Sequence, residues 1–121
     1  MNRLASFVLV ASFALAATAP KSEQKTVSGW VIDSACAFTK GLTKPASADC
    51  AIACGKAGSP LVLVQDDGTI YWPIEEVMPA KSMNARLLPF AGKHVTATGK
   101  VFARNGTTAI VIDKLGESAE K

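Results

Sequence analysis

The sequence predicts a small, mainly β protein, and three observations carry this prediction. Five segments are rich in β-branched and aromatic residues or alternate apolar with polar residues, as strands do. Four of these segments flank Asp-Gly and Asn-Gly turns, which favour hairpins. The chain has 121 residues, about half of them apolar, which suits a single domain with a modest core.

The first predicted strand covers residues 26–33, where β-branched and aromatic residues dominate and Gly29 indicates a bend or bulge. Residues 17–25, immediately before it, are polar and carry no apolar pattern. We therefore expect 17–25 to be a flexible lead-in and the folded domain to begin at residue 26.

The strand pattern is interrupted by an insertion at residues 34–60. Its first part has the glycine and proline content of a loop, whereas 47–55 is predicted to form a short helix. Ser47 or Asp49 can cap the start of this helix, and Gly55 can end it.

Four further strands are predicted in two hairpins, at 61–65 and 69–72, and at 94–103 and 107–115. The first hairpin turns at an Asp-Asp-Gly sequence and the second at Asn-Gly. Between the hairpins, residues 83–88 are predicted to form a short helix, for which Ser82 is a candidate cap.

The order of these elements predicts an OB-fold-like barrel. Five strands with a helical connection between the third and fourth are typical of that fold, whereas a β-sandwich requires about seven strands. The fourth strand presents one apolar face, as a barrel wall needs, and Gly99 permits it to bend. We therefore predict a five-stranded barrel over residues 26–116, with a cysteine-bearing helical insertion after strand one, a short helix between strands three and four, and a tail at 117–121.

The first residues resemble an export signal. Asn2 and Arg3 precede an apolar run of about 14 residues, which is shorter than the roughly 20 residues that span a bilayer. Small residues allow cleavage after Ala16 or Ala19. We expect residues 1–16 to be a signal peptide, the mature protein to be periplasmic or secreted, and no membrane span to remain after the signal is removed.

The charge of the chain disfavours nucleic acid as a partner. Loss of Arg3 with the signal leaves 12 basic residues (13 minus one) against 10 acidic residues, so the mature protein is nearly neutral. Phosphate binding requires a basic stripe, which this balance does not supply. The sequence leaves three kinds of partner open: a small ligand, an exported protein and a second copy of the chain in a thiol-linked homodimer. The homodimer is included because the cysteine count of three is odd.

Four stretches of the sequence together resemble a known group of proteins. They are Gly-Trp-Val-Ile-Asp-Ser-Ala-Cys at 29–36, Cys-Ala-Ile-Ala-Cys and the following Gly-Ser-Pro-Leu within 49–61, Asp-Gly-Thr-Ile-Tyr at 67–71, and Gly-Lys-His-Val-Thr-Ala-Thr-Gly within 91–101. Over residues 27–113 the chain resembles small exported bacterial OB-fold-like proteins of undefined function that carry a Cys-x13-Cys-x3-Cys insertion. In that group histidines often lie between the first two cysteines. This chain has Lys40 and Ser47 there, so the resemblance does not extend to a histidine-assisted metal site.

The three cysteines carry the candidate chemistry. Cys50 and Cys54 are one helical turn apart, with Cβ atoms about 6 Å from each other, whereas a disulfide needs about 3.8 Å. The helix therefore excludes a bond between them, and either can bond to Cys36 instead. Such a bridge closes a loop of roughly 15 to 19 residues and contributes on the order of 3 kcal/mol. The first interpretation is an exported, non-catalytic binding or structural module stapled by a disulfide of Cys36 with Cys50 or Cys54.

Two alternatives keep the cysteines reduced. Cys36, Cys50 and Cys54 as thiolates suit a soft ion, either Cu(I) in a trigonal three-sulfur site or Zn(II). Weaker candidates for a further ligand are His94, Met78 and Met83, whose patterns are more typical of a solvated histidine and of core methionines. In the other alternative the protein is a thiol redox partner, in which Cys50 attacks because the macrodipole at a helix start favours the thiolate form.

Other residues give weaker signals. The paired acids at 66–67 and 75–76 are expected to be solvated turn residues, and no convergent acid, base and nucleophile set points to an enzyme. Trp30, Tyr71 and Trp72 are candidates for a stacking surface of the kind that OB-folds use for nucleic acid or sugars, with barrel packing as their alternative role.

Overall fold

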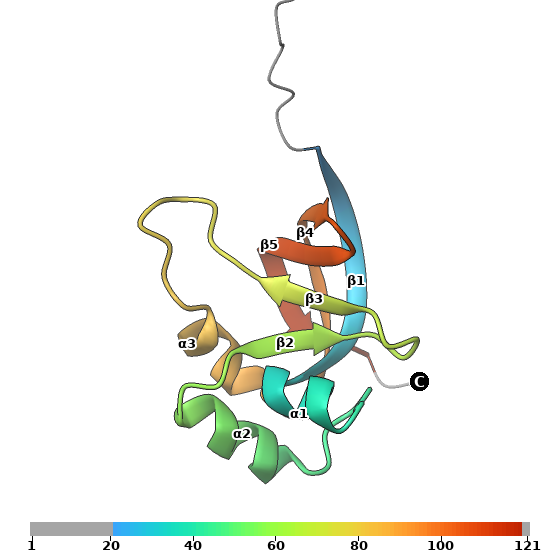
Figure 1. Cartoon of the computed structure of the whole chain (residues 1–121), viewed down its shortest axis with the longest axis vertical. Helices are drawn as coiled ribbons and strands as arrows, with labels where there is room; N and C mark the ends of the chain where they lie inside the picture. The colour runs from blue at the N-terminus through green and yellow to red at the C-terminus, as the bar shows by residue number, and fades with distance from the viewer. Residues whose placement is uncertain (1–20, 120–121) are drawn as a thin grey trace, which may run out of the picture.

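A computed structural model describes residues 21–119, which fold into a closed five-stranded barrel (Figure 1). The strands are β1 (Ser22–Asp33), β2 (Leu61–Val64), β3 (Ile70–Pro73), β4 (His94–Arg104) and β5 (Thr107–Glu117). They close in the order β1-β2-β3-β5-β4, in which the β3–β5 pair is parallel and the other pairs are antiparallel. This confirms the predicted OB-fold-like barrel.

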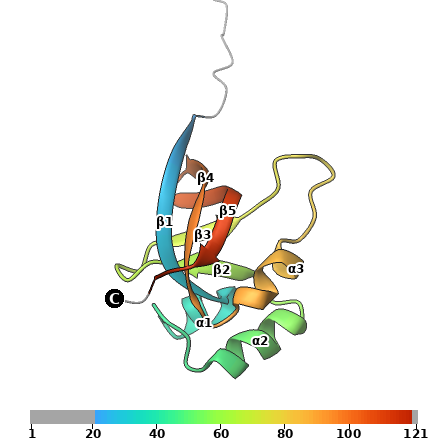
Figure 2. The same cartoon turned by 180° about the vertical axis from the view of Figure 1, so that it is seen from behind.

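The helices lie where the sequence predicts them, with one addition. They are α1 (Ser34–Thr39), α2 (Ala48–Lys56), α3 (Asn84–Leu87) and the 3₁₀ turn η1 (Leu88–Phe90). Figures 1 and 2 show α1 and α2 together at one end of the barrel, with the first residues of β1 at the other end. Within residues 21–119 the structure has no helix long and apolar enough to cross a membrane.

The first strand begins four residues earlier than predicted, so the predicted lead-in is wrong for residues 22–25. These residues pair with β4, starting with Ser22 opposite Phe102. Backbone hydrogen bonds do not depend on apolar side chains, so a polar stretch can extend a strand when its partner strand is long. The Gln24 side chain also donates a hydrogen bond to the Asp113 carboxylate, at 3.0 Å. The predicted signal at 1–16, with both of its cleavage points, lies outside the described residues.

The barrel interior holds the main core. Inward side chains from all five strands meet there. Residues of α2, of α3 and of the segment that leads into β4 close one end of the barrel. Its fully buried or nearly buried members are Val27, Val31, Ala51, Leu61, Leu63, Tyr71, Leu87, Ala91, Val95, Ala97, Val101, Ile110 and Ile112.

A second apolar cluster lies on the outer side of β1, β2 and β3. Val62 and Val64 point away from the barrel interior and pack with Ile32 and with Ala37 of α1. The short strand β2 is therefore buried on both faces, which explains its continuous apolar sequence. This packing holds α1 against the barrel wall.

Of two glycines with a predicted role, Gly99 has that role in the structure and Gly55 does not. In β4, a Cβ on Gly99 would lie 1.9 Å from the carbonyl oxygen of Val111, and the register shifts at this point, so Gly99 marks a barrel bulge. Gly55 does not end α2, which continues to Lys56. It lies against the Leu61 and Leu88 side chains, where a Cβ would be 3.1 Å from each, so its small size serves packing.

Candidate metal site

Asp33 is the last residue of β1 and the N-cap of α1. Its carboxylate accepts a hydrogen bond from the backbone N–H of Cys36, at 3.0 Å, as N-cap residues do. The Ser59 hydroxyl donates a second, longer bond of 3.4 Å to the same oxygen. With only 2% of its surface exposed, Asp33 is held in one orientation at the end of the barrel.

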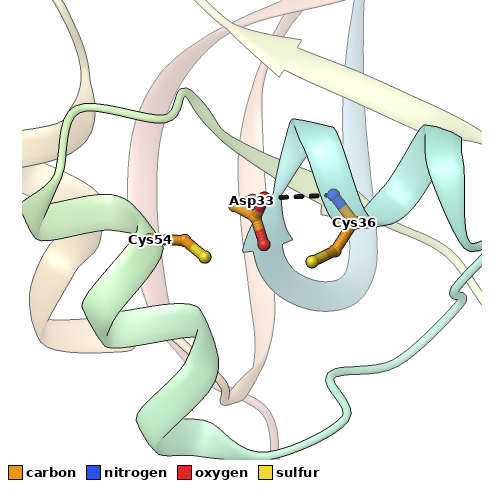
Figure 3. A group of neighbouring side chains, drawn as sticks. All are labelled: Asp33, Cys36 and Cys54. Carbon is orange, nitrogen blue, oxygen red and sulfur yellow. Dashed lines mark hydrogen bonds between the residues drawn. The ribbon is translucent and has the colours of Figure 1, made fainter.

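Neither α1 nor the role of Asp33 is predicted from the sequence, because the start of the insertion has the composition of a loop. The local signal is the Asp-x-x-Cys spacing, which places an acid at the N-cap and Cys36 three residues later. The capping bond turns the chain from β1 into α1 and points Cys36 back toward Asp33 (Figure 3).

The helix α2 carries Cys50 and Cys54. Ser47 is its N-cap and accepts from the backbone N–H of Cys50, at 3.1 Å, which confirms one of the two predicted caps. At the other end, the Asn84 side chain donates to the carbonyl oxygen of Gly55, at 3.2 Å. These contacts at its two ends fix how α2 faces the end of β1.

The structure brings three donor groups together: one carboxylate oxygen and two sulfur atoms. The ligand atoms of Asp33, Cys36 and Cys54 all lie within 4.8 Å of one another. In Figure 3 the sulfur of Cys54 points from α2 toward the carboxylate and toward the sulfur of Cys36. Asp33 is buried and the two cysteines are half-buried, so the group is shielded yet reachable from solvent.

The third cysteine lies beside this group and outside it. Cys50 lines a narrow crevice together with Asp33 and Cys36, and its thiol lies close enough to Cys54 to help raise the pKa of that thiol. The structure thus assembles two of the three predicted cysteines around Asp33. All three cysteines are free, so neither of the predicted disulfides of Cys36 is formed in this structure.

The pKa of Asp33 and the pKa values of the two thiols are shifted in opposite directions. Burial alone acts to raise the pKa of Asp33, but hydrogen bonds from Cys36 and Ser59 outweigh it, and the net pKa lies below its ordinary value. The hydrogen bond to Asp33 is the main cause that raises the pKa of Cys36, followed by desolvation and the negative charge of Asp33. Desolvation, then the charge of Asp33, raises the pKa of Cys54.

These shifts keep Asp33 ionised and both thiols protonated at neutral pH. A thiol that attacks a disulfide needs its thiolate form. The raised pKa values of Cys36 and Cys54 therefore disfavour these two residues as redox nucleophiles. A metal ion, in contrast, can displace the thiol protons when it binds.

The weaker ligand candidates lie elsewhere and have other neighbours. His94 packs edge to face against Trp30, with ring centroids 5.2 Å apart. Met83 packs against the barrel core, and Met78 is 77% exposed on the connection after β3. The group that converges on Asp33 does not include His94.

The three predicted stacking residues divide between the core and the surface. Tyr71 is 7% exposed and belongs to the barrel interior, which corresponds to the alternative role of barrel packing. Trp30 and Trp72 are partly buried and pack against the outer cluster. Trp72 also contacts Phe38 of α1, a residue that the sequence analysis did not single out.

The paired acids have local partners. Asp67 accepts from the backbone N–H of Thr69, at 2.9 Å, inside the β2–β3 turn, as predicted for a turn residue. Glu75 accepts from the backbone N–H of Lys81, and Glu76 forms an ion pair with Lys100 at 2.6 Å.

Comparisons with protein-family models, with curated proteins and with solved structures gave no significant match to this chain.

Proposed function

We propose that the protein is a non-catalytic metal-binding module that holds one Zn(II) ion with Asp33, Cys36 and Cys54. The observation that carries this proposal is the convergence of one carboxylate oxygen and two sulfur atoms within 4.8 Å. In a tetrahedral site with Zn–S distances of about 2.3 Å, two sulfur atoms lie about 3.8 Å apart. The ligand atoms, which lie within 4.8 Å of one another, are therefore close to this spacing.

The carboxylate supports zinc over copper. Cu(I) selects thiolate and thioether ligands, whereas Zn(II) accepts carboxylate oxygen beside sulfur. The three-sulfur Cu(I) site considered from the sequence needs Cys50 inside the group, and the convergent set has Asp33 in that place. The donor set therefore fits Zn(II) better than Cu(I).

The position of Cys50 supports a closed, structural type of site. Cys50 shares the crevice with Asp33 and Cys36 and neighbours the thiol of Cys54. A rotation of its side chain in the first turn of α2 adds a fourth ligand. Four protein ligands are typical of structural zinc sites, whereas catalytic sites leave one position to water.

A direct test is titration of the reduced, metal-free protein with Zn(II) against a chromogenic chelator, with native mass spectrometry for stoichiometry. We expect one Zn(II) per chain. Cys36→Ser and Cys54→Ser should each weaken binding by about 100-fold or more, because each removes a ligand. Cys50→Ser should weaken binding less, because water can replace Cys50 as the fourth ligand while the three convergent ligands remain.

Asp33→Asn tests the role of the acid, and Asp49→Asn is its matched control. Both remove one negative charge, but Asp49 lies in the first turn of α2 and outside the ligand group. We expect only Asp33→Asn to weaken zinc binding. No uptake, or uptake that is unchanged in Cys36→Ser and Cys54→Ser, contradicts the site. Tight Cu(I) uptake that depends on all three cysteines and ignores Asp33→Asn favours the three-sulfur copper alternative.

A disulfide between Cys36 and Cys54 is the second candidate, supported by the proximity of the same two sulfur atoms. Two thiols would lose two protons and two electrons to an oxidant, and the bridge would staple the insertion, contributing about 3 kcal/mol. The intact mass of protein from its native compartment, with and without alkylation, separates the two functions. One alkylated thiol per chain after denaturation indicates the bridge. Three alkylated thiols after denaturation, together with a bound metal in native mass spectrometry of the untreated protein, indicate the zinc site.

A further inference from the structure

An aromatic pair lies on the outside of the barrel, apart from the metal site. The rings of Phe38 in α1 and Trp72 in β3 have centroids 6.0 Å apart and an interplanar angle of 31°. Phe38 is 62% exposed, and it is the one aromatic among the large hydrophobic side chains that are exposed within residues 21–119. The pair therefore offers apolar ring surface to solvent.

The aromatic pair borders a groove of about 400 Å³. The β2–β3 turn and the β4–β5 turn form its other walls, and its lining consists of Phe38, Gly68, Thr69, Ile70, Trp72, Gly106, Thr107 and Thr108. This volume falls within the range of small-molecule sites, which combine apolar walls with a few polar groups. The polar groups here are the hydroxyls of Thr69 and Thr107, since the Thr108 hydroxyl already donates to the carbonyl oxygen of Ile70.

The groove is uncharged, unlike two larger grooves of the protein. No ionisable side chain contributes to its lining. The groove beside the connection after β3 is lined by Glu75, Glu76, Lys81 and Arg86, and the groove beside Trp30 by Asp66, Lys93, His94 and Glu117. An anion, a cation or a nucleic acid would leave its charge without a partner here.

We propose that this groove binds a neutral carbohydrate, with a sugar ring against the Phe38–Trp72 pair. A sugar ring has an apolar C–H face and a rim of hydroxyl groups. The face matches exposed aromatic surface, and the rim matches the hydroxyls of Thr69 and Thr107. This proposal does not depend on the zinc site, because Asp33, Cys36 and Cys54 are not part of the groove lining.

The test uses tryptophan fluorescence in a Trp30→Phe background. The chain has two tryptophans, so this substitution leaves Trp72 as the sole reporter. The protein is titrated with neutral oligosaccharides of the cello, chito, malto and xylo types, to about 10 mM each because millimolar affinity is common for single stacking sites. We expect a saturable change with at least one oligosaccharide, confirmed by calorimetry on the unsubstituted chain.

Phe38→Ala should weaken the binding roughly tenfold, because a lost stacking ring typically has an effect of this size, and Phe38→Tyr should retain it. Phe38 is exposed, so Phe38→Ala should fold normally, which thermal melting checks. Zinc uptake is measured in the same variants, so that failure of one proposal is told apart from failure of the other.

Three results overturn the proposal. The first is the absence of a saturable signal with every neutral oligosaccharide in folded protein. The second is binding that Phe38→Ala leaves unchanged. The third is a concentration-dependent dimer, abolished by Phe38→Ala, which assigns the aromatic pair to contact with a second copy of the chain.

Discussion

At the scale of single residues, Asp33 has three roles that follow from its position at the end of β1. It caps α1, it accepts from Ser59, and it offers an oxygen beside the sulfurs of Cys36 and Cys54. The sequence analysis found the two cysteines but not this acid. Asp33 was counted as the end of a strand, and its approach to Cys54 depends on how α2 packs.

The raised pKa of Cys36 gives a prediction at this scale. Asp33→Asn removes the negative charge that favours the protonated thiol, while the amide oxygen can still cap α1. We expect the pKa of Cys36 to fall and its alkylation near neutral pH to become several-fold faster in the reduced, metal-free protein. The measurement is the pH dependence of iodoacetamide modification, followed by peptide mass spectrometry.

Asp49→Asn is the control for this experiment and should leave the alkylation of Cys36 unchanged. A Cys36 that reacts at the same rate, or more slowly, in Asp33→Asn would show that Asp33 does not raise its pKa.

The lowered pKa of Asp33 gives a second prediction at this scale. A carboxyl whose pKa is lower in the folded protein than in the unfolded chain stabilises the fold above its unfolded pKa, and this stabilisation is lost as the pH falls through the folded value. We expect the metal-free protein to lose stability on acidification below about pH 4. In urea unfolding at a series of pH values, Asp33→Asn should show a shallower loss. Parallel curves for the two proteins would contradict this prediction.

At the scale of elements, Asn84 ties together the parts that carry the site. Its side chain accepts from the backbone N–H of Leu61, at 2.9 Å, and donates to the carbonyl oxygens of Gly55 and Ser59, at 3.2 and 2.8 Å. One side chain thus joins α3 to the end of α2 and to the start of β2. The sequence predicts a helix here but gives no sign of this role, because its three partners lie more than 20 positions away in the chain.

Asn84→Ala should therefore lower the free energy of unfolding by about 2–3 kcal/mol, because it removes the partner of the Leu61 N–H and of the Ser59 carbonyl oxygen. The Gly55 carbonyl oxygen still accepts from the N–H of Gly58. Urea unfolding measures the change. Ser82→Ala is the control: its hydroxyl accepts one exposed bond, of 3.2 Å from the N–H of Asn84, so its cost should stay below about 1 kcal/mol. If Asn84→Ala lowers the free energy of unfolding no more than Ser82→Ala does, Asn84 does not stabilise the contact of α3 with α2 and β2.

At the scale of the whole molecule, the proposed zinc ion would join the barrel to its insertion. Asp33 ends a barrel strand and Cys54 lies on α2, so an ion bound to both links the two parts. A ligand that binds only the folded state stabilises it, by about 2.7 kcal/mol at 100 times its Kd. For a domain of this size we expect Zn(II) to raise the Tm by roughly 10 °C over protein treated with a chelator. Cys36→Ser should abolish this shift, and equal Tm values with Zn(II) and with chelator would contradict the site.

The sequence by itself determined the strands, the two hairpins and the short helix that carries Cys54. These features depend on neighbours in the chain: apolar periodicity, the cap at Ser47, and the Asn105–Gly106 turn, in which both residues adopt positive φ. Only the tertiary structure decided which groups meet. Asp33 joins Cys54, and Phe38 meets Trp72, because the barrel closes and places α1 and α2 against it. Contacts between residues so distant in sequence leave no local pattern from which to predict them.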